Sequence, residues 1–250
     1  MNRNRNGWTC LAVAVGILLA SGVAFGQTQV NRVVFTGTVG QSRIGMTLLV
    51  AAAGNITGGH YFYATDLKDI PLRAGTQGSG IILFAPEGGQ FALRFKGNGS
   101  EAGKPLDFKN SVGMEGRWMK NDSSYPVKLK MEQSWEGAAH ARWYQDVTSE
   151  SDQAFEAGVQ AFYKAVLIGD RAAAARYVDF PLRVNHNGKS RTVDTATQLE
   201  TQWPQIFTPT CVAAFREAMP HDLFVRNGQA MLGDGIAWFG PKGAQAINIP

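Results

Sequence analysis

Residues 127–166 read VKLKMEQSWEGAAHARWYQDVTSESDQAFEAGVQAFYKAV, and the spacing of apolar side chains changes within this stretch. In Val127–Met131 apolar residues alternate with two lysines, which is the period of a half-buried β-strand. From Phe155 to Val166 the apolar residues fall three or four positions apart, which is the period of a helix with one buried face. We therefore expect two domains with separate cores.

The alternating pattern fills residues 30–132. Gly- and Asn-rich turn sequences divide this pattern into alternating rows of about ten residues each. This spacing predicts some seven or eight short antiparallel strands. We expect these strands to form a small barrel or sandwich, because closing the sheet removes exposed edges. The rows are Val33–Val39, Ile44–Val50, Tyr61–Tyr63, Phe91–Phe95, Met114–Trp118 and Val127–Met131.

The second half predicts an α+β domain over residues 150–250, with its helices on one face of a curved antiparallel sheet. Asp170, Thr195 and Thr208 each precede a helical pattern and are expected to cap it. The predicted helices are 155–168, 171–178, 195–202 and 209–218, and the predicted β segments are 182–186, 190–193, 223–225, 235–239 and 244–249. The Phe180-Pro181 pair is expected to end the second helix. Residues 134–149 are predicted to be a linker, partly docked, between this domain and the β domain at 27–133.

The first 26 residues predict a secretory signal peptide. Arg3 and Arg5 precede the apolar run Leu11–Ala20, and Ala24-Phe25-Gly26 offers small residues for cleavage. We expect cleavage near Gly26, a periplasmic or secreted protein, and no membrane span in the mature chain; a retained N-terminal anchor is the alternative. Cleavage would lower the formal charge from +4 to +2, because residues 1–26 hold two arginines and no acid. Such a small excess does not predict a nucleic-acid partner.

Cys211 is the one thiol outside the leader, since Cys10 lies within it, so no internal disulfide is expected. Its place in the first turn of a predicted helix would favour the thiolate. We interpret it nonetheless as a packed structural cysteine, because free cysteines behave as small hydrophobes.

Both halves contain motifs that resemble known families. The motifs are Gly59–Tyr63, Ile70–Leu72 and Gly116–Trp118 in the first half, and Phe162–Ala165, Gly169-Asp170, Tyr177–Asn185, Ile206-Phe207, Asp222–Phe224, Gly228 and Met231–Phe239 in the second. The second half resembles an NTF2-like (cystatin-like superfamily) domain of exported bacterial proteins, and the first is similar to a small β-module of secreted bacterial proteins. The resemblance implies a conical sheet with an apolar pocket in the second half. Some NTF2-like proteins are isomerases, cyclases or dehydratases and many only bind or assemble, so the fold does not fix the function.

The four histidines do not predict a metal centre. His60, His140, His186 and His221 are spaced unlike any zinc motif, so we expect no metal. His221 adjoins Asp222, but adjacent side chains point apart and do not by themselves form a base with its orienting acid. No glycine motif precedes a helix as nucleotide binding requires, so no cofactor is expected.

The sequence leaves three functions open. We favour non-catalytic binding of a protein or a small apolar ligand. The candidate binding residues are Tyr61, Tyr63, Trp118, Tyr177 and Trp238. The second function is an enzyme with its pocket in the C-terminal cone, where Asp179 or His186 would act as base. The third is inhibition of a cell-wall hydrolase through a loop at residues 97–104.

Overall fold

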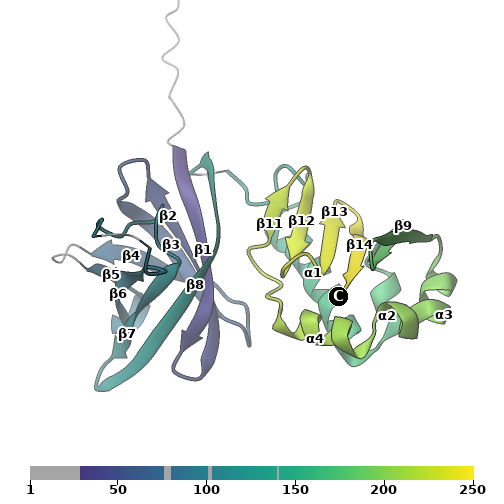
Figure 1. Ribbon diagram of the computed structural model, residues 1–250, viewed down its shortest axis with the longest axis horizontal. Helices are drawn as coiled ribbons and strands as arrows, with labels where there is room; N and C mark the ends of the chain where they lie inside the picture. Colours follow the sequence, from purple (N-terminus) through teal and green to yellow (C-terminus); the bar gives the residue numbers. More distant parts are fainter. Residues whose placement is uncertain (1–28, 76–79, 101–102, 140) are drawn as a thin grey trace, which may run out of the picture.

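The computed structural model describes residues 29–75, 80–100, 103–139 and 141–250 (Figure 1). The predicted signal peptide and His140 lie outside the described residues, as do residues 101–102 of the loop at 97–104. Two bodies lie side by side in Figure 1, a strand-only body and a body of helices and strands. They correspond to the two halves between which the hydrophobic period changes.

The first body is a closed antiparallel barrel and not a sandwich, the two folds that the sequence left open. Each strand pairs with the next, and the first also pairs with the last, so the sheet has no open edge. The strands are β1 (Gln29–Val39), β2 (Ser42–Ala51), β3 (Ile56–Tyr63), β4 (Ile70–Gly75), β5 (Ile81–Phe84), β6 (Gln90–Lys96), β7 (Gly113–Lys120) and β8 (Ser123–Ala138), with a 3₁₀ turn η1 (Pro86–Gly88) between β5 and β6.

Apolar side chains fill the inside of the barrel. One side of each strand supplies them, as the alternation predicted, and they form one cluster of buried residues. Its largest fully buried members include Phe35, Met46, Leu83, Phe91 and Met114. The barrel therefore has a packed core in the manner of small barrels.

β8 is longer than the alternation indicated. It continues to Ala138, and Ser134, Trp135 and Glu136 pair with β1. The register of β1 and β8 shifts between Val34 and Phe35, and this irregularity breaks the alternation that the sequence pattern relied on. The first part of the predicted linker is thus strand.

The second body is an α+β domain, as expected, built on a six-stranded sheet in the order β10-β9-β14-β13-β12-β11. The sheet is mixed, and the expectation of a wholly antiparallel sheet was wrong, because β14 lies parallel to β9. Its elements are α1 (Asp152–Ile168), α2 (Arg171–Ala175), β9 (Val178–His186), β10 (Lys189–Val193), α3 (Ala196–Ile206), α4 (Pro209–Glu217), β11 (Phe224–Arg226), β12 (Gln229–Leu232), β13 (Ala237–Gly240) and β14 (Gly243–Ile249).

Capping side chains begin the helices of this domain. Asp170, Thr195 and Thr208 each accept a hydrogen bond from a backbone N–H of the first turn, as predicted, and Ser151 does the same for α1. Two predicted ends were wrong: α2 stops at Ala175, so that Phe180-Pro181 lies within β9, and α3 continues through Pro204. No helix in the described ranges has the length and hydropathy needed to cross a bilayer.

The core of the second body is rich in aromatic rings. Phe162 of α1 contacts the rings of Phe207, Phe215 and Phe239 at centroid distances of 5.5–6.3 Å. These rings join α1, α4 and β13 across the helix-facing side of the sheet. The core is separate from that of the barrel.

Two glycines of paired barrel strands test how tightly the barrel closes. A Cβ on Gly37 of β1 would lie 1.9 Å from the carbonyl oxygen of Lys128, whereas nothing lies within 4 Å of a Cβ on Gly137 of β8. We expect Gly37→Ala to lower the free energy of unfolding by about 1–3 kcal/mol, because the strands must move apart. Gly137→Ala should change it by less than about 0.5 kcal/mol. Urea denaturation followed by circular dichroism measures both, and equal effects would contradict the tight β1–β8 contact.

Candidate functional site

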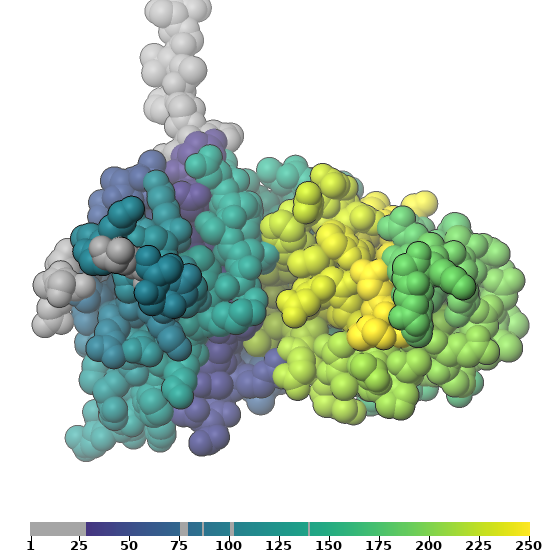
Figure 2. All heavy atoms as spheres, in the orientation of Figure 1, coloured from purple at the N-terminus to yellow at the C-terminus, as the bar shows by residue number. Residues whose placement is uncertain are grey.

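The outer face of β2 and β3 carries the barrel's share of a cluster of polar side chains at the domain junction. Thr47 and His60 are directly paired across the two strands, so their side chains point to the same side. That side is the barrel exterior, yet Thr47 is only 1% exposed, because the second domain covers it. Figure 2 shows the two bodies in contact along this boundary.

Phe62 extends the covered face of β3. Its ring lies over Gly45 of β2, where a Cβ would come within 2.1 Å of the ring. The ring meets that of His221 edge-on, with centroids 4.4 Å apart. Gly45 thus makes room for an aromatic contact between the barrel and the second domain.

Asp222 is the buried carboxylate of the junction. It follows α4 with a φ of 50°, in the left-handed region, and is 8% exposed. Its Oδ2 lies 2.6 Å from Thr47 Oγ1 and 2.6 Å from His60 Nε2, both in the barrel. One side chain of the second domain is therefore held by two barrel side chains.

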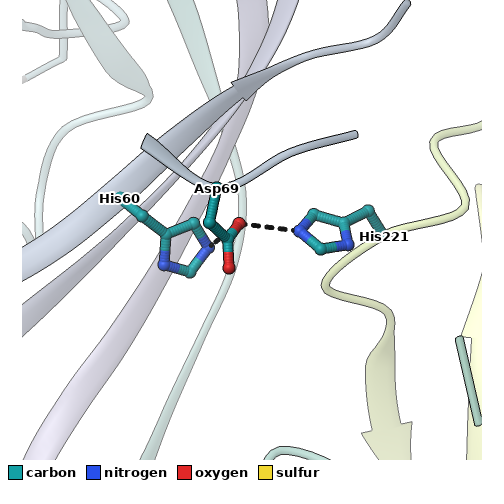
Figure 3. Close-up of side chains that lie close together, drawn as sticks. All are labelled: His60, Asp69 and His221. Atoms are coloured by element: carbon teal, nitrogen blue, oxygen red, sulfur yellow. Dashed lines mark hydrogen bonds and ion pairs between the residues drawn. The ribbon is translucent and has the colours of Figure 1, made fainter. Parts of the chain in front are cut away.

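His221 points away from Asp222 and pairs with two other acids. Its Nε2 lies 2.8 Å from Oδ1 of Asp69, which follows β3, and its Nδ1 lies 2.5 Å from Oε2 of Glu156 in α1. The Asp69 oxygen is also 3.4 Å from His60 Nε2. Figure 3 shows the Asp69 carboxylate between the two imidazole rings.

Buried groups of the second domain hold the Glu156 carboxylate in place. The hydroxyl of Tyr144 donates to its Oε1 at 2.5 Å, and the backbone N–H of Asp222 donates to the same oxygen at 2.9 Å. The Tyr144 oxygen in turn accepts from the N–H of Leu223. This chain of hydrogen bonds sets the position of the His221–Asp222 turn.

Opposite charges stabilise the ionised forms in this cluster. Burial alone would lower the pKa of His221, but the hydrogen bonds with Asp69 and Glu156 outweigh it and raise the pKa to about 10. Burial also opposes the charged form of His60, yet the hydrogen bond and charge of Asp222 raise its pKa. Burial favours neutral Asp222, but the hydrogen bond and charge of His60 lower its pKa. The junction thus favours two imidazolium rings facing carboxylates.

The candidate catalytic residues named from the sequence do not come together. Asp179 and His186 lie near opposite ends of β9, about 20 Å apart at strand rise. Asp179 accepts a hydrogen bond from Gln245 at 2.9 Å. His186 is exposed and lines an open hollow of about 480 Å³ with Lys189 and Arg191. The structure therefore shows no acid–base pair formed by these two residues.

The candidate binding aromatics divide between the two cores. Tyr61 is 3% exposed inside the barrel, burial raises its pKa to about 12, and its ring meets those of Tyr63 and Phe91. Trp118 packs against the same core. Tyr177 packs against the core of the second domain, and Trp238, also partly buried, lies in β13. No single surface contains all five.

The sequence interpretation missed the junction because it treated each histidine separately. His60 and His221 are far apart in the chain, and neither their spacing nor any local pattern links them. β2 is buried on both faces over Ile44–Leu48, but its sequence there alternates apolar residues with Gly45 and Thr47, so the pattern gave no sign of the cover. The inference that His221 and Asp222 point apart agrees with the structure.

Cys211 is fully buried, and burial raises the pKa of its thiol to about 12. Its backbone N–H donates to the Thr208 cap. Desolvation therefore outweighs the helix N-terminus that would favour a thiolate, as expected for a packed cysteine.

A thiol reagent tests the state of Cys211. In the Cys10→Ser protein, where Cys211 is the one thiol, we expect no reaction with a disulfide reagent in the native state at neutral pH and full reaction in denaturant, because modification requires opening of the core. Absorbance of the released thiolate measures both rates. Prompt reaction of the native protein would contradict a buried, protonated thiol.

Stability should depend on the charge of His221. Its pKa in the folded chain, about 10, lies above its ordinary value of 6.5, so its contribution is complete below about pH 6.5 and is lost as the pH rises through 10. We expect His221→Gln to remove an alkaline loss on the order of a few kcal/mol. Urea unfolding in metal-free buffer between pH 6 and 10 measures it, with His186→Gln as the exposed control. Parallel curves for the protein and His221→Gln would contradict the predicted pairing.

Comparison of the chain with family models, with curated proteins and with solved structures found no match. The resemblances of the two halves therefore stay predictions.

Proposed function

We propose that this chain is an exported, non-catalytic binding or interaction protein. One observation carries the proposal: the titratable side chains that converge at the junction are paired with one another and join the two domains. His60 and Thr47 hold Asp222, and Asp69 and Glu156 hold His221. Groups used in this way fix the relative position of two surfaces, as a two-domain binding platform requires.

The positions of the candidate catalytic residues support the same proposal. Asp179 is bonded to a glutamine, His186 is exposed at a hairpin, and Cys211 is a buried thiol with a raised pKa. General acid–base catalysis needs such groups within hydrogen-bond reach of one reacting atom. These three are distributed over different elements.

We propose further that the second domain is an NTF2-like cone and that the protein works in the periplasm or outside the cell. The six-stranded sheet with helices on it supports the first statement, together with the motifs at Tyr177–Asn185 and Met231–Phe239. The leader pattern at residues 1–26 supports the second. The partner class is a protein or a small apolar ligand; a cell-wall hydrolase is the protein partner to try first.

An activity screen tests the non-catalytic proposal. The purified chain is incubated with generic ester, glycoside and peptide substrates, alongside Asp179→Asn and His186→Gln. We expect no turnover above buffer in any sample, because Asp179 and His186 do not form an acid–base pair and the junction histidines and acids are engaged with one another. Turnover that disappears in either variant, while its circular dichroism spectrum is unchanged, would establish the enzyme instead.

A further inference from the structure

We propose that His60, Asp69 and His221 form a binding site for one divalent transition-metal ion, with Zn²⁺ as its natural occupant. This inference stands on the junction geometry and does not depend on the proposed function. The ligands come from both domains, since His60 and Asp69 belong to the barrel and His221 to the second domain. A bound ion would therefore connect the two bodies directly.

The spacing of the three ligand atoms fits a small metal ion. One atom from each side chain lies within 4.8 Å of the other two. Zinc bonds of about 2.0–2.2 Å in a tetrahedron place neighbouring ligand atoms about 3.4 Å apart. His60 Nε2 and Asp69 Oδ1 are 3.4 Å apart, and His221 Nε2 and Asp69 Oδ1 are 2.8 Å apart. Asp69 would have to move about half an ångström away from His221 to reach that spacing, and its side chain, 53% exposed and outside any strand, has room to do so.

Buried groups behind His221 orient it for this role. A metal-binding histidine commonly donates its second ring N–H to a carboxylate, which fixes the ring and makes the free nitrogen a better ligand. Glu156 accepts from Nδ1 of His221, so Nε2 faces Asp69 and His60. Glu156 is itself held by Tyr144 and by the backbone N–H of Asp222. The supporting shell is thus complete on the second-domain side.

The charges of the junction also suit a divalent cation. Three carboxylates, those of Asp69, Glu156 and Asp222, surround two imidazoles. With both rings protonated the set carries one net negative charge, and with both rings neutral it carries three. One divalent ion replacing two protons leaves the net charge unchanged. Metal binding therefore needs no other charge compensation.

The donor types select among the metals. Two imidazole nitrogens and one carboxylate favour Zn²⁺, Cu²⁺ or Ni²⁺, whereas Mg²⁺ and Ca²⁺ prefer sets made of oxygen. A water at the exposed Asp69 side would supply the fourth position. That exposed side also gives the ion a path from solvent.

Zinc titration of the purified, tag-free, EDTA-dialysed chain tests the site. We expect isothermal titration calorimetry to show one Zn²⁺ per chain and Mg²⁺ to show no saturable heat. Asp69→Asn, His60→Gln and His221→Gln should each abolish or strongly weaken binding. Glu156→Gln, which removes the carboxylate behind His221, should weaken it about 10- to 100-fold. His186→Gln is the control, because it removes an exposed histidine remote from the junction, and should bind as the parent does.

Two further measurements distinguish a loss of metal binding from a loss of folding. Thermal unfolding of each variant reports whether it is folded, and Asp69→Asn is the deciding variant if either histidine change unfolds the chain, because Asp69 is the most exposed of the three ligands. Co²⁺ added in place of Zn²⁺ should give the visible absorption of a tetrahedral site in the parent and lose it in folded Asp69→Asn. The absence of saturable zinc binding, or binding that folded Asp69→Asn retains in full, would overturn the proposal.

Discussion

The arrangement of this molecule depends on one buried carboxylate. Asp222 is 8% exposed and belongs to the second domain, but its side chain bonds Thr47 and His60 of the barrel. An ionised carboxylate taken out of water costs several kcal/mol unless opposite charge and hydrogen bonds offset it. Here the offsetting groups are on the other domain. Separating the domains would leave the carboxylate and His60 without each other, so the junction favours one relative position.

This constraint explains features of the barrel that its own fold does not need. A closed barrel is stable with polar residues outside, yet β2 and β3 present Thr47, Phe62 and His60 on their outer face. Gly45 lacks a side chain, so the Phe62 ring can lie over it and meet the His221 ring edge-on. These residues on the outer face of β2 and β3 are explained by the second domain that packs against them. The two domains thus have separate cores but complementary surfaces at the junction.

Local patterns in the sequence predicted the positions of strands and helices better than they predicted which elements pair or pack together. Alternation located six of the eight barrel strands, all but β4 and β5, and Asp170, Thr195 and Thr208 located helix starts, because both signals act within a few residues. The parallel pairing of β9 with β14 has no such local signal. The end of β8 was missed because the β1–β8 irregularity breaks the alternation. The candidate site was not predicted because it also lacks a local signal. Its two histidines belong to different domains and meet only after both have folded.

The charge count at the junction bears on why two histidines face three acids there. A structural ion pair is satisfied by one cation for each carboxylate, so two imidazolium rings leave one of the three acids over. Asp69 is the surplus: it lies between two rings that Asp222 and Glu156 already neutralise. A third carboxylate oxygen aimed at two imidazole nitrogens is what a divalent ion requires, and it places the surplus charge where such an ion would use it.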